Sequence, residues 1–246
     1  MKSVYRTPLR YFDLIEAFPQ PGCALCRLLL RGVEQFVDSL LYEYTNSNEM
    51  HAVFSQSRGV CSEHGHLLRH NKQGNVLAIA RLYRTVLDDV LATLAAPADE
   101  PQQPSWAGRL LGGQARMDNT PLAKRLEPTS GCVVCDVMLV YEQDYIGIIC
   151  RYAGEARFQE AYKASEGMCL PHFRQIARAL TDPADTRALI AIQAAIWQRL
   201  RDELETFIDK QNYEHIGEPM GREGDSWVRA IRRMAGEKGV FGLRRA

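Results

Sequence analysis

The chain has 246 residues, of which 46% are hydrophobic and 24% are charged. This composition is that of an ordinary globular protein, and the length suits one large domain or two smaller halves. Thirty basic and thirty acidic side chains leave a formal net charge of zero, so the whole molecule has no electrostatic reason to bind nucleic acid or an anionic membrane.

The N-terminal segment is interrupted by Pro8, Arg10 and Asp13 and lacks the apolar core of a signal peptide. The most apolar long stretch, residues 188–197, is about half the length of a membrane span. We therefore expect a cytoplasmic protein without a membrane segment. In a reducing compartment, closely spaced cysteines act more often as metal ligands or redox catalysts than as disulfide partners.

Two short motifs organise the first part of the chain. The first, GCALC, contains Cys23 and Cys26, and the second, GVCSEH, contains Cys61 and His64. Apolar residues recur at helical spacing after each motif, so each motif is expected to open a helix. We assign residues 1–96 to a first helical module that carries these two half-sites.

Both motifs return in the same order later in the chain. GCVVC contains Cys132 and Cys135, and GMCLPH contains Cys169 and His172. The two half-sites are separated by 34 residues in the first copy and by 33 in the second. A repeat of constant order and nearly constant spacing indicates a duplicated module.

The second copy defines the remaining boundaries. Residues 97–128 are rich in proline, glycine and polar side chains and are expected to be a linker. The second module spans residues 129–212, and residues 213–246 form a C-terminal helix, expected to dock through Trp227, with a basic tail. Strand-like alternation is scarce, so the predicted class is all-α: two pseudo-repeated helical modules, each with a Cys3His metal site, packed as a helical bundle.

Three thiolates and one imidazole form a closed tetrahedral shell for a structural zinc ion. Free N–H groups and the positive end of the dipole at a helix N-terminus stabilise thiolate over thiol. We therefore expect two zinc ions, with an iron–sulfur cluster as the alternative. The spacing leaves open whether the ligands of one metal come from one copy or from both, and whether the metals form a shared cluster. The expected metal ligands are Cys23, Cys26, Cys61, His64, Cys132, Cys135, Cys169 and His172.

The repeat argues against further ligands. His66 and His70 correspond to Arg174 and Arg178 in the second copy, and arginine does not ligate a metal. The remaining candidates are treated in the same way: Glu63 corresponds to Pro171, and Cys150 lies on an apolar helix face, where an inert thiol is expected.

The ligand sets leave no open position for a substrate. The sequence therefore favours a non-enzymatic metal-binding helical scaffold that interacts with a protein partner. A thiol oxidoreductase or redox sensor is the alternative, because CxxC at a helix start also activates a nucleophilic cysteine. An iron–sulfur protein is the third hypothesis. Nucleic-acid binding is disfavoured because the basic C-terminal residues lack interleaved aromatic side chains. The oligomeric state is left open.

The order of these features resembles that of a family of bacterial cytosolic proteins. The features are GCxxC, an apolar helix, GxCxxH, a second copy of both, and a closing helix that begins at GDSW (residues 224–227). The resemblance spans nearly the whole chain. It implies that the eight motif residues belong together, and it implies no activity.

Overall fold

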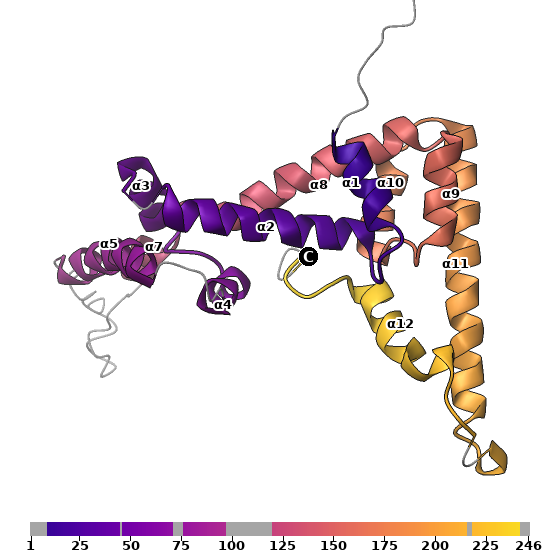
Figure 1. The fold of residues 1–246 in the computed structure, drawn as a ribbon. Helices are drawn as coiled ribbons and strands as arrows, with labels where there is room; N and C mark the ends of the chain where they lie inside the picture. The colour runs from indigo at the N-terminus through magenta and orange to yellow at the C-terminus, as the bar shows by residue number, and fades with distance from the viewer. Residues whose placement is uncertain (1–8, 45, 71–75, 97–119, 216–217, 242–246) are drawn as a thin grey trace, which may run out of the picture. The chain divides into compact units, whose positions relative to one another are not determined.

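The computed structural model describes residues 9–44, 46–70, 76–96, 120–215 and 218–241. These residues form helices and no strand, which confirms the predicted all-α class (Figure 1). Most of the expected linker (97–119) and the end of the basic tail (242–246) lie outside the described residues. In the described part of the chain, no helix combines the length and the apolarity that crossing a membrane requires.

The helices follow one another along the chain with short connections. Their bounds are α1 Leu9–Ala17, α2 Ala24–Tyr42, α3 Asn48–Gln56, α4 Ser62–His70, α5 Val76–Ala95, α7 Thr120–Leu126, α8 Val133–Tyr152, α9 Ala156–Ala164, α10 Leu170–Ala179, α11 Pro183–Asp209 and α12 Ser226–Ala235. Two 3-10 turns, η1 Tyr213–His215 and η2 Arg222–Asp225, lie between α11 and α12.

The chain forms two compact units. The first consists of residues 1–35 and 137–246, and the second consists of residues 36–136. The dividing points fall inside α2 and α8, so each of these helices contributes one part to each unit. The first unit therefore takes the start of the first sequence copy together with most of the second copy.

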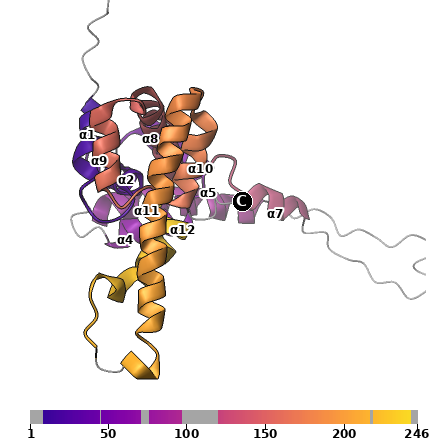
Figure 2. The ribbon, with the colours of Figure 1, turned by 90° about the vertical axis from the view of Figure 1, so that its right-hand side faces the viewer.

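Aromatic side chains fill the core of the first unit. Phe18, just after α1, packs against Phe158 and Tyr162 of α9 with ring centroids 5.4 and 5.5 Å apart. Tyr11 of α1 contacts Tyr152 at the end of α8. Burying one such ring contributes about 2–3 kcal/mol to the free energy of unfolding. Helix α9 also packs along α11, as Figure 2 shows.

Helix α11 is the longest helix in the described residues, and its start has a clear local cause. The carboxylate of Asp182 accepts the backbone N–H groups of Ala184 and Asp185 at 2.8 and 2.9 Å. Pro183 occupies the first helical position, where its missing N–H has no cost. Together these residues fix the point at which α11 begins.

In the second unit, α3 packs along α5, and α7 contacts α5 as well. Phe54 of α3 meets Tyr83 of α5 edge to face, with centroids 6.1 Å apart. The amide of Thr129 donates to the carbonyl of Gln56 at 2.8 Å. This bond ties the segment that leads into the second CxxC motif to the end of α3.

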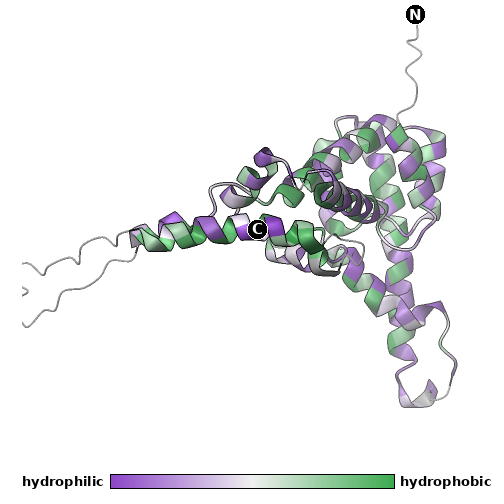
Figure 3. Cartoon of the chain, turned by 60° about the vertical axis from the view of Figure 1, so that its left-hand side comes forward, coloured by the Kyte–Doolittle hydropathy of each residue, from purple (hydrophilic) through white to green (hydrophobic). Residues whose placement is uncertain are grey.

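Most helices carry hydrophobic and hydrophilic residues side by side (Figure 3). Helix α12 departs from the expected orientation, because Trp227 is 51% exposed and its helix neighbours Ile231 and Met234 are exposed too. The buried residues of α12 are Ser226 and Arg233. The prediction that Trp227 docks this helix is therefore wrong; an ion pair between Arg233 and Glu166 holds that side instead.

The turn before α10 requires a glycine. Gly167 has a φ of +80°, and a Cβ on it would lie 2.7 Å from Nε2 of the buried Gln193. The Oε1 atom of Gln193 accepts the amide of Met168 at 3.0 Å, so the side chain is held in place.

Replacing Gly167 by alanine is expected to lower the free energy of unfolding by about 2 kcal/mol, because the substitution adds both backbone strain and a steric clash. The matched control is Gly147→Ala in α8, where an added Cβ meets nothing within 4 Å. That change should raise stability by up to about 1 kcal/mol. Urea denaturation followed by circular dichroism measures both; equal stability of the two variants would contradict this account of the turn.

Candidate metal centres

All four sequence motifs lie at helix N-termini. Helices α2, α4, α8 and α10 each begin one residue after the first ligand of a motif. In every case the carbonyl of that first cysteine accepts the amide four residues later, at 2.8–3.1 Å. The first cysteine is thus the N-cap residue, and the second ligand is the third residue of the helix. The prediction that each half-site opens a helix is confirmed.

The first group of donors lies in the first compact unit. Cys23 and Cys26 come from the start of α2, and Cys169 and His172 come from the start of α10. The sulfurs of Cys26 and Cys169 are 3.7 Å apart. The Nδ1 atom of His172 lies 3.3–3.5 Å from all three sulfurs. All four residues are buried. We call this set centre 1.

The second group lies within the second compact unit. Cys61 and His64 open α4, and Cys132 and Cys135 open α8. The sulfurs of Cys61 and Cys135 are 3.7 Å apart, and Nδ1 of His64 lies 3.2–3.6 Å from the three sulfurs. His64 is buried, whereas the three cysteines are partly exposed. We call this set centre 2.

The ligands are exchanged between the two sequence copies. Centre 1 combines the CxxC of the first copy with the CxxH of the second, and centre 2 combines the CxxC of the second copy with the CxxH of the first. The eight predicted residues therefore gather in two groups of four, each with ligand atoms within 4.8 Å of one another. This answers the question that the spacing alone left open.

The spacing of the donors fits one tetrahedral ion. With Zn–S near 2.3 Å and Zn–N near 2.05 Å, a regular tetrahedron has S···S edges of about 3.8 Å and S···N edges of about 3.6 Å. The observed edges are 3.7 Å and 3.2–3.6 Å in both centres. A disulfide needs sulfurs about 2.05 Å apart, so these contacts are not disulfide bonds. The seven cysteines are free thiols.

In centre 1 one thiol ionises at the expense of the others. Burial opposes ionisation of Cys23, but hydrogen bonds from Cys169 and Cys26 and the charge of His172 hold its pKa well below the ordinary value. Hydrogen bonds to Cys169 and Cys23, together with burial, raise the pKa of Cys26. Burial lowers the pKa of His172, but the negative charge of Cys23 and hydrogen bonds to its neighbours outweigh this effect and raise it well above normal.

Centre 2 repeats this pattern. Burial opposes ionisation of Cys132, but hydrogen bonds from His64 and from the backbone N–H groups of Cys61, Cys135 and Val134 lower its pKa to about 6. Burial and the negative charges of Cys132 and Cys61 raise the pKa of Cys135. Each centre therefore stabilises one thiolate well. A divalent cation among the four donors supplies the charge that lets the other thiols ionise, so the donor set fits such an ion.

A buried carboxylate supports His172. The Oε1 atom of Glu142 lies 3.1 Å from Nε2 of His172, although the ring N–H does not point straight at it. Gln175 donates to the same carboxylate oxygen at 2.8 Å. A carboxylate behind the imidazole fixes the ring with Nδ1 toward the sulfurs, as in many zinc sites. The sequence analysis missed Glu142, although the matching EQ pairs at 34–35 and 142–143 in the two copies were a signal.

The chain segment after α12 covers centre 1. The ring of Phe241 lies 4.7 Å from that of His172, and both Val240 and Phe241 are buried. A Cβ on Gly236 would lie 3.6 Å from the sulfur of Cys169, so the backbone passes close to the centre. This cover explains why centre 1 is fully buried.

The other sequence candidates stay outside both centres. His66 is exposed, Glu63 is partly exposed, and the side chain of His70 lies outside the described residues. Cys150 is partly buried, and burial raises the pKa of its thiol.

The fold and the two centres define an all-α protein with a pair of exchanged Cys3His sets. The chain belongs to the family described as "Family of unknown function (DUF6062)", whose profile matches residues 13–240 and so includes all eight donors. A relative from Caldicellulosiruptor sp. (strain Rt8B.4), "Uncharacterized 23.9 kDa protein in xynA 3'region", is 22% identical over 204 residues. The alignment covers 82% of this chain and 89% of the relative. No solved structure matches the chain.

Replacing Glu142 by glutamine should weaken zinc binding at centre 1 by about tenfold or more, because the imidazole loses its negatively charged partner. The measurement is competition with a chromophoric chelator, in a chain whose centre 2 is removed by Cys61→Ser. Glu160→Gln, an exposed change on α9, is the control and should leave the affinity unchanged. Equal affinities for the two variants would show that Glu142 does not support the site.

Proposed function

We propose that the chain binds two zinc ions, one at each centre, and that both ions are structural. The observation that carries this proposal is the convergence of three sulfurs and one imidazole nitrogen, at tetrahedral spacing, twice in one chain. Four protein donors fill the coordination shell of zinc, which is the usual arrangement of a structural site rather than a catalytic one.

The same spacing argues against an iron–sulfur cluster. Cluster ligands bind different iron atoms, with inorganic sulfides between them, so their sulfur atoms lie farther apart than donors around one ion. Here all four donor atoms of each centre lie within 4.8 Å of one another. A single ion fits this spacing.

A redox role has one specific observation in its favour. Cys132 is partly exposed and has a pKa of about 6, so it is a thiolate at neutral pH. However, a dithiol catalyst requires only the CxxC pair, whereas the structure gathers a third cysteine and a histidine around each pair. A zinc shell uses all four residues, and we therefore favour it.

Exchange of the ligands increases the stabilisation that each ion provides. Centre 1 joins Cys26 to Cys169, which are 143 positions apart, and centre 2 joins Cys61 to Cys135, which are 74 apart. Closing loops of these lengths, rather than the 34 residues between half-sites of one copy, costs the unfolded chain about 0.7–1.3 kcal/mol more entropy per centre. The ligand bonds add to this stabilisation directly.

The function that follows is a non-enzymatic scaffold of the cytoplasm, where reduced thiols persist, that presents helices to a protein partner. The exposed side chains of Trp227 and Ile231 on α12 support the role in binding a protein, since aromatic residues are enriched at interfaces.

Paired cysteine substitutions test both the metal and the exchange. Zinc content, measured by elemental analysis after purification without chelator, should be two per chain for the natural sequence. Cys61→Ser with Cys132→Ser removes two ligands of centre 2 and should leave one zinc. Cys23→Ser with Cys61→Ser damages both centres and should leave less than half an ion per chain, by the loss expected from incomplete shells.

The reverse pattern, with one zinc in the Cys23 and Cys61 pair and none in the other, would show that each metal is bound within one sequence copy. Cys150→Ser is the matched control and should retain both ions. A brown protein that contains iron in place of zinc would contradict the proposal itself.

Centre 2 should release zinc faster than centre 1. Its thiols are partly exposed, whereas centre 1 is buried under Phe241, so a chelator reaches centre 2 without local unfolding. We expect release at least about tenfold faster from the Cys23→Ser chain, which retains centre 2, than from the Cys61→Ser chain, which retains centre 1. Stopped-flow mixing with a coloured chelator measures both rates. Equal rates would show that burial does not control access.

A further inference from the structure

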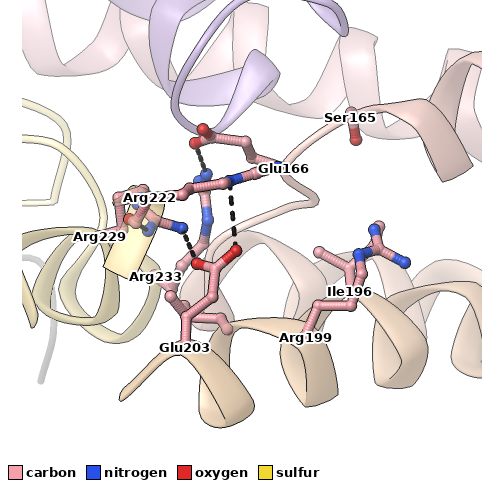
Figure 4. Close-up of a pocket in the computed structure, with 9 residues that line it drawn as sticks. Ser165, Glu166, Ile196, Arg199, Glu203, Arg222, Arg229 and Arg233 are labelled. Atoms are coloured by element: carbon pink, nitrogen blue, oxygen red, sulfur yellow. Dashed lines mark hydrogen bonds and ion pairs between the residues drawn. The ribbon is translucent and has the colours of Figure 1, made fainter. Parts of the chain in front are cut away.

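A second polar site lies in the first compact unit, where α11, η2 and α12 meet (Figure 4). Two adjoining hollows share the lining residues Glu166, Arg222, Arg229 and Arg233, and the larger hollow has a volume of about 500 Å³. None of the metal ligands lines it. Together the charged residues of the walls are Arg199, Arg222, Arg229, Arg232, Arg233, Glu166, Glu203 and Asp225.

Few carboxylates serve these arginines. Glu203 is shared, since one of its oxygens lies 3.2 Å from Nε of Arg222 and the other pairs with Arg229 (Figure 4). Glu166 pairs with Arg233 and also accepts the backbone N–H of Gly22 at 2.9 Å. Asp225 lies 2.7 Å from Nε of Arg229. The carboxylates are therefore divided among several donors.

Two guanidinium groups keep unused donors. Arg199 of α11 has no carboxylate within ion-pair distance among the described residues, and in Figure 4 it stands apart from the marked ion pairs. Arg233 is 2% exposed, and its Nη1 atom has no acceptor in the described part of the chain. Outside the lining, Glu237 lies 3.7 Å from Arg232 and compensates that residue.

We propose that this arginine-lined hollow binds a small ligand through a phosphate group. Guanidinium forks match the paired oxygens of phosphate, and a dianion can engage two forks at once. A monocarboxylate satisfies only one fork. The volume suits a small organic phosphate, and the side chains of Ile196 and Leu200 give one wall an apolar part for the rest of such a ligand. The site is independent of zinc in both its residues and its chemistry.

The charge ledger predicts opposite effects for two substitutions. Arg199→Gln removes an uncompensated cation and should weaken phosphate binding at least about fivefold. Glu203→Gln removes the carboxylate that competes for Arg222 and Arg229 and should strengthen binding by a similar factor. Arg201→Gln, two residues away on α11 and outside the lining, is the matched control and should leave binding unchanged.

The experiment is isothermal titration calorimetry of the full, zinc-loaded chain with inorganic phosphate, at constant ionic strength set with acetate. Glycerol 3-phosphate is the second probe; tighter binding than that of inorganic phosphate identifies an organic phosphate as the ligand, and equal binding identifies phosphate itself. Circular dichroism verifies that each variant is folded. If Glu203→Gln does not fold, Arg199→Gln against Arg201→Gln decides.

Three results would overturn the proposal. Saturation by neither probe at millimolar concentration would show that no site exists. Equal affinity of the Arg199→Gln and Arg201→Gln chains would show that any bound phosphate lies elsewhere. Weaker binding by a folded Glu203→Gln chain would show that the ion pairs serve only to join α12 to α11.

Discussion

Three sulfurs packed around one imidazole nitrogen cannot all be negatively charged unless a cation lies among them. In both centres one cysteine ionises, stabilised by hydrogen bonds, and its neighbours then hold their protons more firmly. The helix starts that carry these donors are aimed at a common point by the fold. Much of the surrounding structure follows from this constraint, because the four helices α2, α4, α8 and α10 meet in pairs only where their N-cap cysteines do.

The features that depend on local sequence could be predicted. CxxC and CxxH at the start of an apolar periodic segment indicate helix N-termini, and the structure places all four there because the N-cap and third helical positions face the same side. The repeat correctly set aside His66 and Glu63. The helical class followed from the same periodicity.

The features that depend on contacts between distant segments could not be predicted. Spacing within each copy is the same whether Cys26 meets Cys61 or Cys169, so the exchange of ligands was invisible in the sequence. The orientation of α12 was misjudged for a related reason. Trp227 and Ile231 form its apolar face, but the buried ion pair of Arg233 with Glu166 determines which side of the helix turns inward.

The two centres have equal donors and unequal surroundings. Centre 1 has the carboxylate of Glu142 behind its histidine and the ring of Phe241 above it, whereas His64 of centre 2 has no acceptor for Nε2 in the described part of the chain. Glu166, which also accepts the N–H of Gly22 beside Cys23, connects centre 1 to the arginine-lined hollow. Centre 1 is thus the more deeply integrated of the two, and centre 2 is the more accessible.

The exchange of half-sites also bears on how such a chain could arise. One copy alone carries a CxxC and a CxxH that, in this architecture, belong to different centres. A polypeptide with a single copy would therefore complete its ligand sets only by pairing with a second molecule, and the pair would hold two equivalent ions. Fusing the two genes end to end would convert that symmetric dimer into one continuous chain, after which each half was free to diverge.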